Sequence, residues 1–258
     1  MRTLIVVPTY NERENILQLL PLLLHSPIRP DVLVVDDGSP DGTAAAVRRF
    51  IDAGDAAGPA SPARPDHPPA EGRVALIERE GKLGLGSAYI RGFRHALQQG
   101  YDCVFEMDAD LSHPPEALPR FMEAIAGAHC VVGSRYVRGG RIVGWSLLRW
   151  AISFGGNLLS RLVLRCGVRD MTSGYRCYRA EALRAVDLDG IISEGYFFQV
   201  EMLYTLHLAG FTITEIPITF TDRRAGESKM SGVIFREALG NLLRMRREKE
   251  KRRPARTL

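Results

Sequence analysis

Short apolar runs alternate with stretches of helical spacing along the first half of the chain. The apolar runs begin near residues 3, 31, 73 and 101, and the helical stretches follow them at residues 11–25, 42–53, 86–99 and 115–127. Strands that alternate with helices in this way are typical of a parallel sheet covered by helices. The pattern therefore predicts the α/β class, with a mostly parallel central sheet flanked by helices.

The first helical stretch carries its own start signal. Asn11 and Glu14 have the spacing of a capping box, in which the two side chains accept hydrogen bonds from each other's backbone N–H groups. Apolar side chains then recur on one face, at Ile16, Leu19, Leu20 and Leu23. The sequence predicts a helix capped by Asn11 that buries this face.

Two segments depart from the alternating pattern. Residues 54–72 are rich in Pro, Ala and Gly, and they predict a flexible surface insertion. With 258 residues, of which 45% are hydrophobic, the chain can build one sizeable core. We expect one domain over residues 1–243, followed by a basic tail over residues 244–258.

The net positive charge of the chain is concentrated in the tail. The chain has a formal net charge of +4, whereas residues 244–258 contain eight Arg or Lys residues against two Glu residues. Such a tail is typical of a solvated, disordered end, of a segment attracted to anionic lipids, or of a nucleic-acid-binding arm. It lacks aromatic side chains that could stack on bases, which disfavours nucleic acid.

Cysteine usage and hydropathy bear on the compartment. The four cysteines form no CxxC pair, which favours a reducing compartment; they are Cys103, Cys130, Cys166 and Cys177. The first apolar run is too short for a signal peptide, and no run reaches the roughly 18 apolar residues of a spanning helix. We expect a cytoplasmic protein that meets a membrane, if it does, from the side.

Polar clusters follow each of the four expected strands. They read PTYNE, DDGSPDGT, GKLGLGSA and DADLSH. Any one of them could be an ordinary turn, but the carboxyl ends of parallel strands meet at one edge, where ligands bind. Four clusters together indicate a shared cleft. The paired carboxylates of Asp108 and Asp110 then predict a divalent cation, Mg²⁺ or Mn²⁺.

The glycine-rich cluster matches neither common phosphate-binding motif. It lacks the order of a P-loop and the third glycine of a dinucleotide fingerprint. It could be a tight loop that brings Lys82 near a phosphate-bearing ligand, or a plain turn between a strand and a helix.

Taken together, the motifs resemble one family. VPTYNERENI, VVDDGSPDGT, KLGLGSAYIRG, MDADLSHPPE, GSRY, SGYRCYR, GYFFQVEM and RRAGESK, in this order, are similar to the dolichol-phosphate (polyprenol-phosphate) mannosyltransferases of glycosyltransferase family 2. The resemblance covers roughly residues 3–232 without the insertion. It implies the GT-A fold with peripheral amphipathic helices and no carboxyl-terminal membrane helices.

The resemblance also implies a donor site for GDP-mannose. It places Pro8, Tyr10 and Glu12 at the nucleoside, Val35 and Asp37 at base and ribose, and Asp108 with the Ala109 backbone at ribose and diphosphate. Asp110 is implied as the firmest metal ligand. Ser112 stands where some relatives have Gln, so its shorter side chain binds metal either directly or through water. Arg223 and Lys229 resemble a cationic loop that closes over the diphosphate; the alternative is a solvated charge run.

The segment over residues 145–164 is the candidate binding site for the acceptor of the sugar. Arg149, Ser153 and Asn157 are four residues apart, so a helix would place them on one face, where they suit a phosphate headgroup. The remaining side chains suit a bilayer interface: Trp145, Leu147, Leu148, Trp150 and Phe154. The alternative is a core-packing helix with two surface tryptophans. The resemblance adds Arg135 as a further contact to the acceptor phosphate.

A polyprenyl phosphate acceptor would need no general base, because its second pKa lies near 6 and its oxygen is largely anionic at neutral pH. A single displacement would invert the donor linkage and give a β-linked mannosyl phosphate lipid and GDP. Two alternatives stay open: a UDP-glucose-dependent enzyme, and a non-catalytic subunit that binds nucleotide sugar or lipid phosphate. Whether a membrane-embedded partner protein takes part also stays open.

Overall fold

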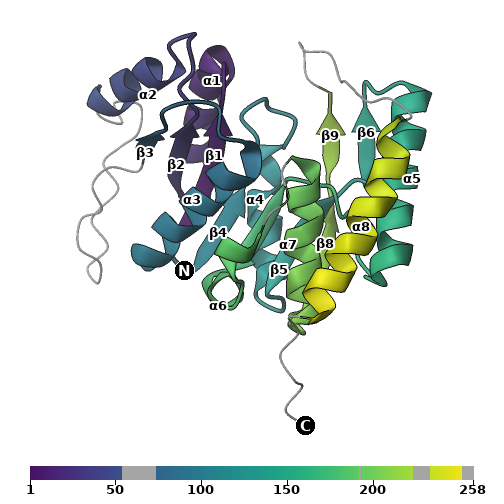
Figure 1. Ribbon diagram of the computed structural model, residues 1–258. Helices are drawn as coiled ribbons and strands as arrows, with labels where there is room; N and C mark the ends of the chain where they lie inside the picture. The colour runs from purple at the N-terminus through teal and green to yellow at the C-terminus, as the bar shows by residue number, and fades with distance from the viewer. Residues whose placement is uncertain (54–73, 192, 194, 223–232, 252–258) are drawn as a thin grey trace.

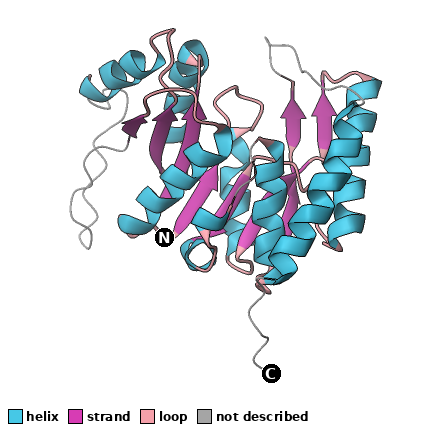
Figure 2. Cartoon of the chain, in the orientation of Figure 1, coloured by secondary structure: helices cyan, strands magenta, loops and turns pink. Residues whose placement is uncertain are grey.

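The computed structural model describes residues 1–53, 74–191, 193, 195–222 and 233–251, and its centre is a seven-stranded sheet (Figures 1 and 2). The strands run in the order β3-β2-β1-β4-β7-β5-β8. Their bounds are β1 Thr3–Thr9, β2 Asp31–Asp36, β3 Val74–Glu78, β4 Cys103–Glu106, β5 Cys130–Ser134, β7 Arg176–Arg179 and β8 Ile213–Pro217.

Strand direction decides where the loops lie. The pairs β1–β2, β1–β4, β2–β3 and β5–β8 are parallel, whereas β7 is antiparallel to both of its neighbours, β4 and β5. The carboxyl ends of β1 to β5 therefore meet at one edge of the sheet. This confirms the mostly parallel sheet, and it brings the four polar clusters to the same edge.

Helices cover both faces of the sheet because strand side chains alternate. Along β1, Leu4 and Val6 join one buried cluster, whereas Ile5 and Val7 join the other. The first cluster is covered by α3 (Leu85–Gln98), α6 (Ala180–Arg184) and α7 (Tyr196–Leu208). The second is covered by α1 (Arg13–Leu24), α2 (Thr43–Asp52) and α4 (Leu118–Ile125), the last of which follows a short 3-10 turn, η1 (Pro115–Ala117).

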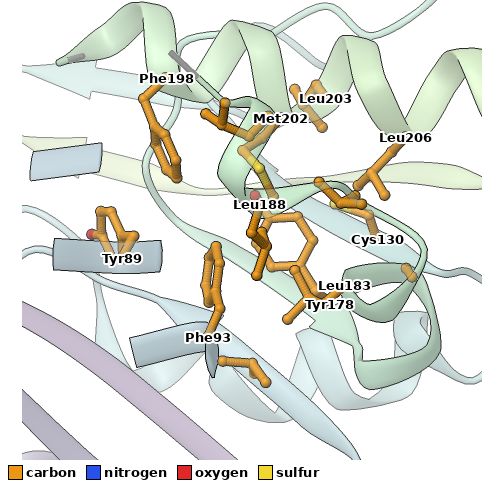
Figure 3. Close-up of a cluster of buried hydrophobic side chains, with 14 of the residues drawn as sticks. Tyr89, Phe93, Cys130, Tyr178, Leu183, Leu188, Phe198, Met202, Leu203 and Leu206 are labelled. Carbon is orange, nitrogen blue, oxygen red and sulfur yellow. The ribbon is translucent and has the colours of Figure 1, made fainter. Parts of the chain in front are cut away.

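Aromatic rings tie α3 and α7 together in the first cluster (Figure 3). Tyr89 of α3 stacks on Phe198 of α7 with ring centroids 5.9 Å apart, and Phe93 meets Tyr178 of β7 edge to face at 5.6 Å. Helix α3 also approaches β1 closely, because a Cβ atom on Gly92 would overlap Val6. These contacts fix the helix whose amino-terminal end borders the third polar cluster.

The second half of the chain adds a smaller layer beside the sheet. Strands β6 (Arg141–Val143) and β9 (Thr219–Thr221) pair in parallel. Helix α5 (Leu147–Leu164) and helix α8 (Val233–Lys251) lie side by side next to them (Figure 1). A second 3-10 turn, η2, spans Leu188–Gly190. Within the described part of the chain, no helix is both long enough and apolar enough to cross a bilayer.

Most local predictions are confirmed, with one correction. The four helices predicted in the first half are present, and Ile16, Leu19, Leu20 and Leu23 are buried. The capping box is wrong: α1 begins after Glu12 with no side-chain cap, because Asn11 has φ 59° and lies outside the helix. The predicted insertion lies outside the described residues. The predicted boundary at residue 243 falls within α8, and residues 244–251 of the tail continue this helix.

Candidate active site at the carboxyl edge of the sheet

The loops after β1 and β2 are joined by hydrogen bonds. The Thr9 hydroxyl donates to the buried Asp36 carboxylate at 2.8 Å, and the Ser39 hydroxyl donates to the same carboxylate at 2.6 Å. One turn further on, the Asp41 carboxylate accepts from the backbone N–H of Arg13 at 3.1 Å and from the Thr43 hydroxyl at 2.6 Å. The first two polar clusters therefore form one rigid wall.

The predicted donor residue Asp37 connects this wall to the loop after β3. The Arg79 Nε–H donates to Asp37 at 2.5 Å, and the Leu83 N–H donates to it at 3.1 Å. The Arg79 guanidinium also donates to the Ser87 hydroxyl and to the Gly84 carbonyl, so it holds both ends of the glycine-rich loop. Gly38 (φ 66°) allows the two loops to touch, since a Cβ there would lie 3.2 Å from the Arg79 carbonyl oxygen.

The remaining residues that were predicted to line a nucleoside lie along the same edge. The Lys82 ammonium nitrogen lies 4.4 Å from the centroid of the Tyr10 ring, which places these two predicted residues in contact. Glu12 accepts a hydrogen bond from the Asn15 amide at 2.6 Å. Pro8 is half-buried near the end of β1, and Val35 is buried in β2.

The DAD segment begins at the end of β4 and is held from three sides. The Tyr89 hydroxyl donates to the Asp108 carboxylate at 3.2 Å, and the Asp108 N–H donates to His113 Nδ1 at 3.1 Å. His113 is buried and stacks on Tyr175 with ring centroids 5.0 Å apart. The Ser112 hydroxyl donates to Asp110 Oδ1 at 2.5 Å. Asp108, Ala109, Asp110 and Ser112 therefore occupy one tight turn.

This turn offers oxygen donors that suit a hard divalent cation. The Asp108 side chain is 28% exposed, so its carboxylate is reachable, and the Asp110 carboxylate and Ser112 hydroxyl lie together in the same turn. Among the residues that the structure describes, no group of three or more His, Cys, Asp or Glu side chains could enclose a metal ion. A cation held here would complete its shell with oxygen atoms from a ligand or from water.

A buried polar network lies directly before the DAD segment. The Tyr178 hydroxyl donates to Glu106 at 3.0 Å, and Arg176 donates to the backbone carbonyls of Gln199 and Met171. Burial raises the pKa of Glu106 to about 7, although the positive charge of Arg176 opposes this rise. Burial together with the Asp108 charge also raises the pKa of Tyr89 well above its usual value, so its hydroxyl stays protonated and donates.

Arg135, which was predicted to contact an acceptor phosphate, is paired with a buried carboxylate. Its guanidinium donates to both oxygens of Asp170 at 2.7 Å and to the Thr172 hydroxyl at 2.8 Å. The Asp170 side chain is fully buried, and that of Arg135 is 7% exposed. Its charge is therefore largely balanced within the protein.

The structure places the three predicted helix residues on one face of α5, and Thr172 links this face to Arg135. Arg149 donates to Asp222 at 2.7 Å and lies 4.3 Å from the Trp145 ring. The Ser153 hydroxyl accepts from the Tyr136 hydroxyl at 2.8 Å. Asn157 is buried; its amide donates to the Thr172 hydroxyl at 3.0 Å and accepts from the Met171 N–H at 2.8 Å. The helical spacing is confirmed, and Asn157 mainly holds the chain at residues 171–172.

The opposite face of α5 is an exposed apolar stripe. Its exposed side chains are Leu147, Leu148, Trp150, Phe154, Leu158 and Leu162, with exposures from 41% for Leu158 to 87% for Leu147. Trp145 does not belong to this stripe, because its ring packs edge to face on Phe220 and under Arg149. Leu239 and Leu243 of α8 add further exposed apolar surface next to α5.

Some expectations lie outside the described residues, and some residues were missed. Arg223 and Lys229 belong to residues 223–232, of which the structure gives no description. The prediction missed Arg79, Tyr89, His113 and Asp170. Arg79 lies at the end of an expected strand, and Asp170 lies three residues before the SGYRCYR segment, so position relative to a strand or motif is a signal for both.

The sequence is similar to known proteins over most of its length. Residues 4–187 match the family described as Glycosyl transferase family 2. The chain is 48% identical over 244 residues to an undecaprenyl-phosphate mannosyltransferase from Micrococcus luteus, with 95% of this chain and 93% of that protein covered. It is 44% identical over 239 residues to a polyprenol monophosphomannose synthase from Mycolicibacterium smegmatis, with 92% and 84% covered.

Solved structures share the fold at low identity. A mannosyltransferase from Pyrobaculum calidifontis in complex with GDP-Man and Mn²⁺ superposes with a TM-score of 0.59 at 18% identity, covering 97% of this chain and 64% of that chain. Glucosyl-3-phosphoglycerate synthase from Mycobacterium tuberculosis in complex with UDP gives 0.60 at 19% identity, covering 95% and 79%. These likenesses confirm the predicted GT-A fold.

Proposed function

Since the chain belongs to glycosyl transferase family 2, we propose that it transfers mannose from GDP-mannose to a polyprenyl phosphate and releases GDP. One observation carries this proposal. The loops that bear Tyr10, Asp37, Lys82 and Asp108 meet at the carboxyl edge of parallel strands in a chain that matches two polyprenyl-phosphate mannose enzymes almost end to end.

In this proposal the donor lies along the wall formed by the first three loops. Tyr10 and Glu12, with Pro8 behind them, line the nucleoside, Val35 and Asp37 serve base and ribose, and Lys82 faces the phosphates. Asp37 also holds Arg79 and the Leu83 N–H, which keeps the glycine-rich loop at a fixed distance from the wall. The position of the glycine-rich loop in the donor pocket is thus set by Asp37, which belongs to the loop after β2.

The oxygen donors of the DAD turn suit Mg²⁺ or Mn²⁺. We propose that Asp110 holds the ion, with Asp108 and Ser112 beside it and the Ala109 backbone against the donor. When bound, the ion supplies positive charge against the departing diphosphate. Tyr89 and His113 keep the Asp108 carboxylate and backbone oriented.

The acceptor phosphate brings its own negative charge, so the chain needs to align it rather than deprotonate it. A phosphate oxygen attacks the anomeric carbon of mannose while the bond from this carbon to the diphosphate breaks, and GDP leaves with the electron pair. Displacement from the opposite side inverts the linkage and gives the β-mannosyl phosphate lipid. We propose Arg149 and Ser153 as phosphate contacts, with Arg135 and Asn157 shaping the site.

Two further parts of the proposal concern the cationic segment over residues 223–232 and the contact with a membrane. Arg223 and Lys229 would stabilise the charge that grows on the diphosphate as the bond breaks. The exposed apolar stripe of α5 and the basic residues of α8 would dock the protein reversibly on the cytoplasmic face of a membrane, where its lipid acceptor resides.

The decisive experiment is transfer of labelled mannose from GDP-mannose to a short polyprenyl phosphate, with Mn²⁺, with Mg²⁺ and with neither. We expect labelled lipid only with a metal, and much less product from UDP-glucose. Asp110→Ala should abolish transfer, whereas Asp52→Ala, at an exposed carboxylate in α2, should not. A folded Asp110→Ala protein with normal turnover would contradict the metal assignment. Glucose transfer at a higher rate than mannose transfer would contradict the donor assignment.

A further inference from the structure

A separate cavity lies between α5 and the loop after β5, apart from the loops that follow β1 to β4. Its volume is about 250 Å³, and its lining residues are Tyr136, Phe154, Asn157, Leu158, Arg161 and Arg169. None of the donor-side residues borders it. It adjoins the acceptor group, because Asn157 lines it and Tyr136 bonds to Ser153.

Two arginines line this cavity. Arg161 and Arg169 have no ion-pair partner among the described residues, and the Arg161 Nε–H is buried without a hydrogen-bond partner there. The neighbouring Arg135 and Arg149 differ, since Asp170 and Asp222 balance their charges.

The nearby Glu215 carboxylate bonds to backbone N–H groups and not to the guanidinium groups of Arg161 or Arg169. Glu215 accepts hydrogen bonds from the backbone N–H groups of Arg169, at 2.7 Å, and Asp170, at 2.9 Å. Among the described residues, the cavity therefore combines an apolar side with an excess of positive charge at the two arginines. An anion with several acceptor oxygens, such as a phosphate group, complements two guanidinium groups.

The apolar lining indicates what carries the anion. Phe154 and Leu158 are 42% and 41% exposed and belong to the apolar stripe of α5, so the cavity is continuous with that stripe. Pockets for whole small molecules measure roughly 300–1,000 Å³, so this cavity suits a headgroup whose hydrocarbon chains stay outside. A ligand with a charged headgroup inside the cavity and an apolar chain along the stripe has the chemistry of a membrane lipid.

We infer that this cavity binds the phosphate headgroup of an anionic membrane phospholipid, between Arg161 and Arg169, with the acyl chains against the apolar stripe of α5. This lipid is not the acceptor. Its binding fixes the rotation and depth of α5 at the bilayer surface, and therefore the direction from which the acceptor phosphate reaches Arg149 and Ser153.

The test uses the full chain and a phosphatidylglycerol with short acyl chains, below the concentration at which it forms micelles. Calorimetric titration without GDP-mannose should show one bound lipid per chain. Arg161→Gln with Arg169→Gln should weaken binding about tenfold or more, because two charge-assisted contacts are lost. Arg165→Gln is the matched control: it removes one exposed cation from the end of the same helix, outside the cavity, and should change the affinity by about twofold or less.

Three kinds of outcome would overturn the inference. The first is no binding by the wild-type chain, or equal loss in the Arg165 control. The second is inorganic phosphate binding as tightly as the lipid, which would make the cavity a free-anion site. The third is farnesyl phosphate displacing the lipid and losing its own affinity in the double variant, which would make it the acceptor site. The single variant Arg169→Gln tests the inference even if the double variant misfolds, because Arg169 is exposed and its substitution should not disturb folding. Because binding is measured without a donor, the result is independent of whether mannose transfer occurs.

Discussion

The Lys82 ammonium nitrogen lies 4.4 Å from the centroid of the Tyr10 ring, so a residue from the loop after β1 meets one from the loop after β3. The two loops are not neighbours, because β2 lies between β1 and β3 in the sheet order. A cation on the face of a tyrosine ring is attracted by the ring electrons. Together with the Asp37–Arg79 pair, it joins three loops around the proposed donor site.

Tyr10→Leu should therefore weaken GDP-mannose binding. In the proposed donor site the ring positions Lys82 toward the phosphates, and loss of a contact worth about 0.5–1 kcal/mol corresponds to a roughly two- to fivefold rise in KM. Tyr10→Phe keeps the ring and should stay close to wild type. Steady-state kinetics with varied GDP-mannose measures both. Equal effects of the two substitutions would show that the hydroxyl, not the ring, matters.

Arg79→Met should lower the free energy of unfolding by about 3 kcal/mol, because it leaves the Asp37 carboxylate buried without its cation. The side chains are 9% and 8% exposed, so water compensates little. Urea unfolding measures the change. Adding Asp37→Asn to Arg79→Met should restore part of the loss; if it adds a second full loss instead, the two residues are not energetically coupled.

Ser112→Ala should weaken Mn²⁺ binding about tenfold in the presence of GDP, because its hydroxyl orients the Asp110 carboxylate through a 2.5 Å hydrogen bond. Paramagnetic resonance of free Mn²⁺ reports this without any turnover. Ser146→Ala, which removes the hydroxyl that caps α5, is the control. Unchanged Mn²⁺ affinity in Ser112→Ala would leave Asp110 to act without this support.

Glu106→Gln should make stability less dependent on pH. Burial raises the pKa of Glu106 to about 7, whereas an unfolded carboxyl titrates near 4.3, so the folded state holds the proton more tightly. The stabilisation is complete below about pH 4 and is lost as pH rises through about 7, for a total on the order of 3 kcal/mol. Urea unfolding between about pH 5 and pH 8 should show a smaller decline for the variant. Parallel declines would mean that Glu106 stays charged in the fold.

Leu148→Ser with Trp150→Ser should weaken binding to anionic vesicles at both low and high salt, because apolar burial is not screened. The side chains are 71% and 43% exposed, so folding should be little affected. Trp145→Phe should leave vesicle binding unchanged, since Trp145 packs against Phe220 and Arg149. Vesicle co-sedimentation compares the wild type, the double variant and Trp145→Phe. If Trp145→Phe has the larger effect, the membrane-contacting surface lies elsewhere.

The sequence was most informative where structure is local. Apolar periodicity placed β1 to β4 and the helices that follow them, because burial on a strand or helix repeats at short intervals. The Asn11 capping box failed because Asn11 takes a left-handed conformation, with its N–H bonded to the Ser39 hydroxyl. That partner belongs to the next loop, which short-range spacing does not reveal.

For the candidate site, the sequence identified the residues themselves but not the residues with which their side chains form hydrogen bonds and ion pairs. Helical spacing correctly put Arg149, Ser153 and Asn157 on one face of α5, but the burial of Asn157 depends on Met171 and Thr172 packing against that face. Likewise, Asp37 could be picked out from its motif, whereas its pairing with Arg79 arises from contact between loops that are separated by β3. Contacts of this kind require the fold.

The antiparallel strand β7 has a consequence for synthesis on the ribosome. Strands β3, β2, β1 and β4 all precede residue 107, but the free edge of β4 is covered only when residues 176–179 arrive. At roughly 5–20 residues per second, a nascent chain waits several seconds with an open strand edge flanked by apolar residues. A chaperone that holds emerging chains would therefore protect this protein most while residues 107–179 are being translated.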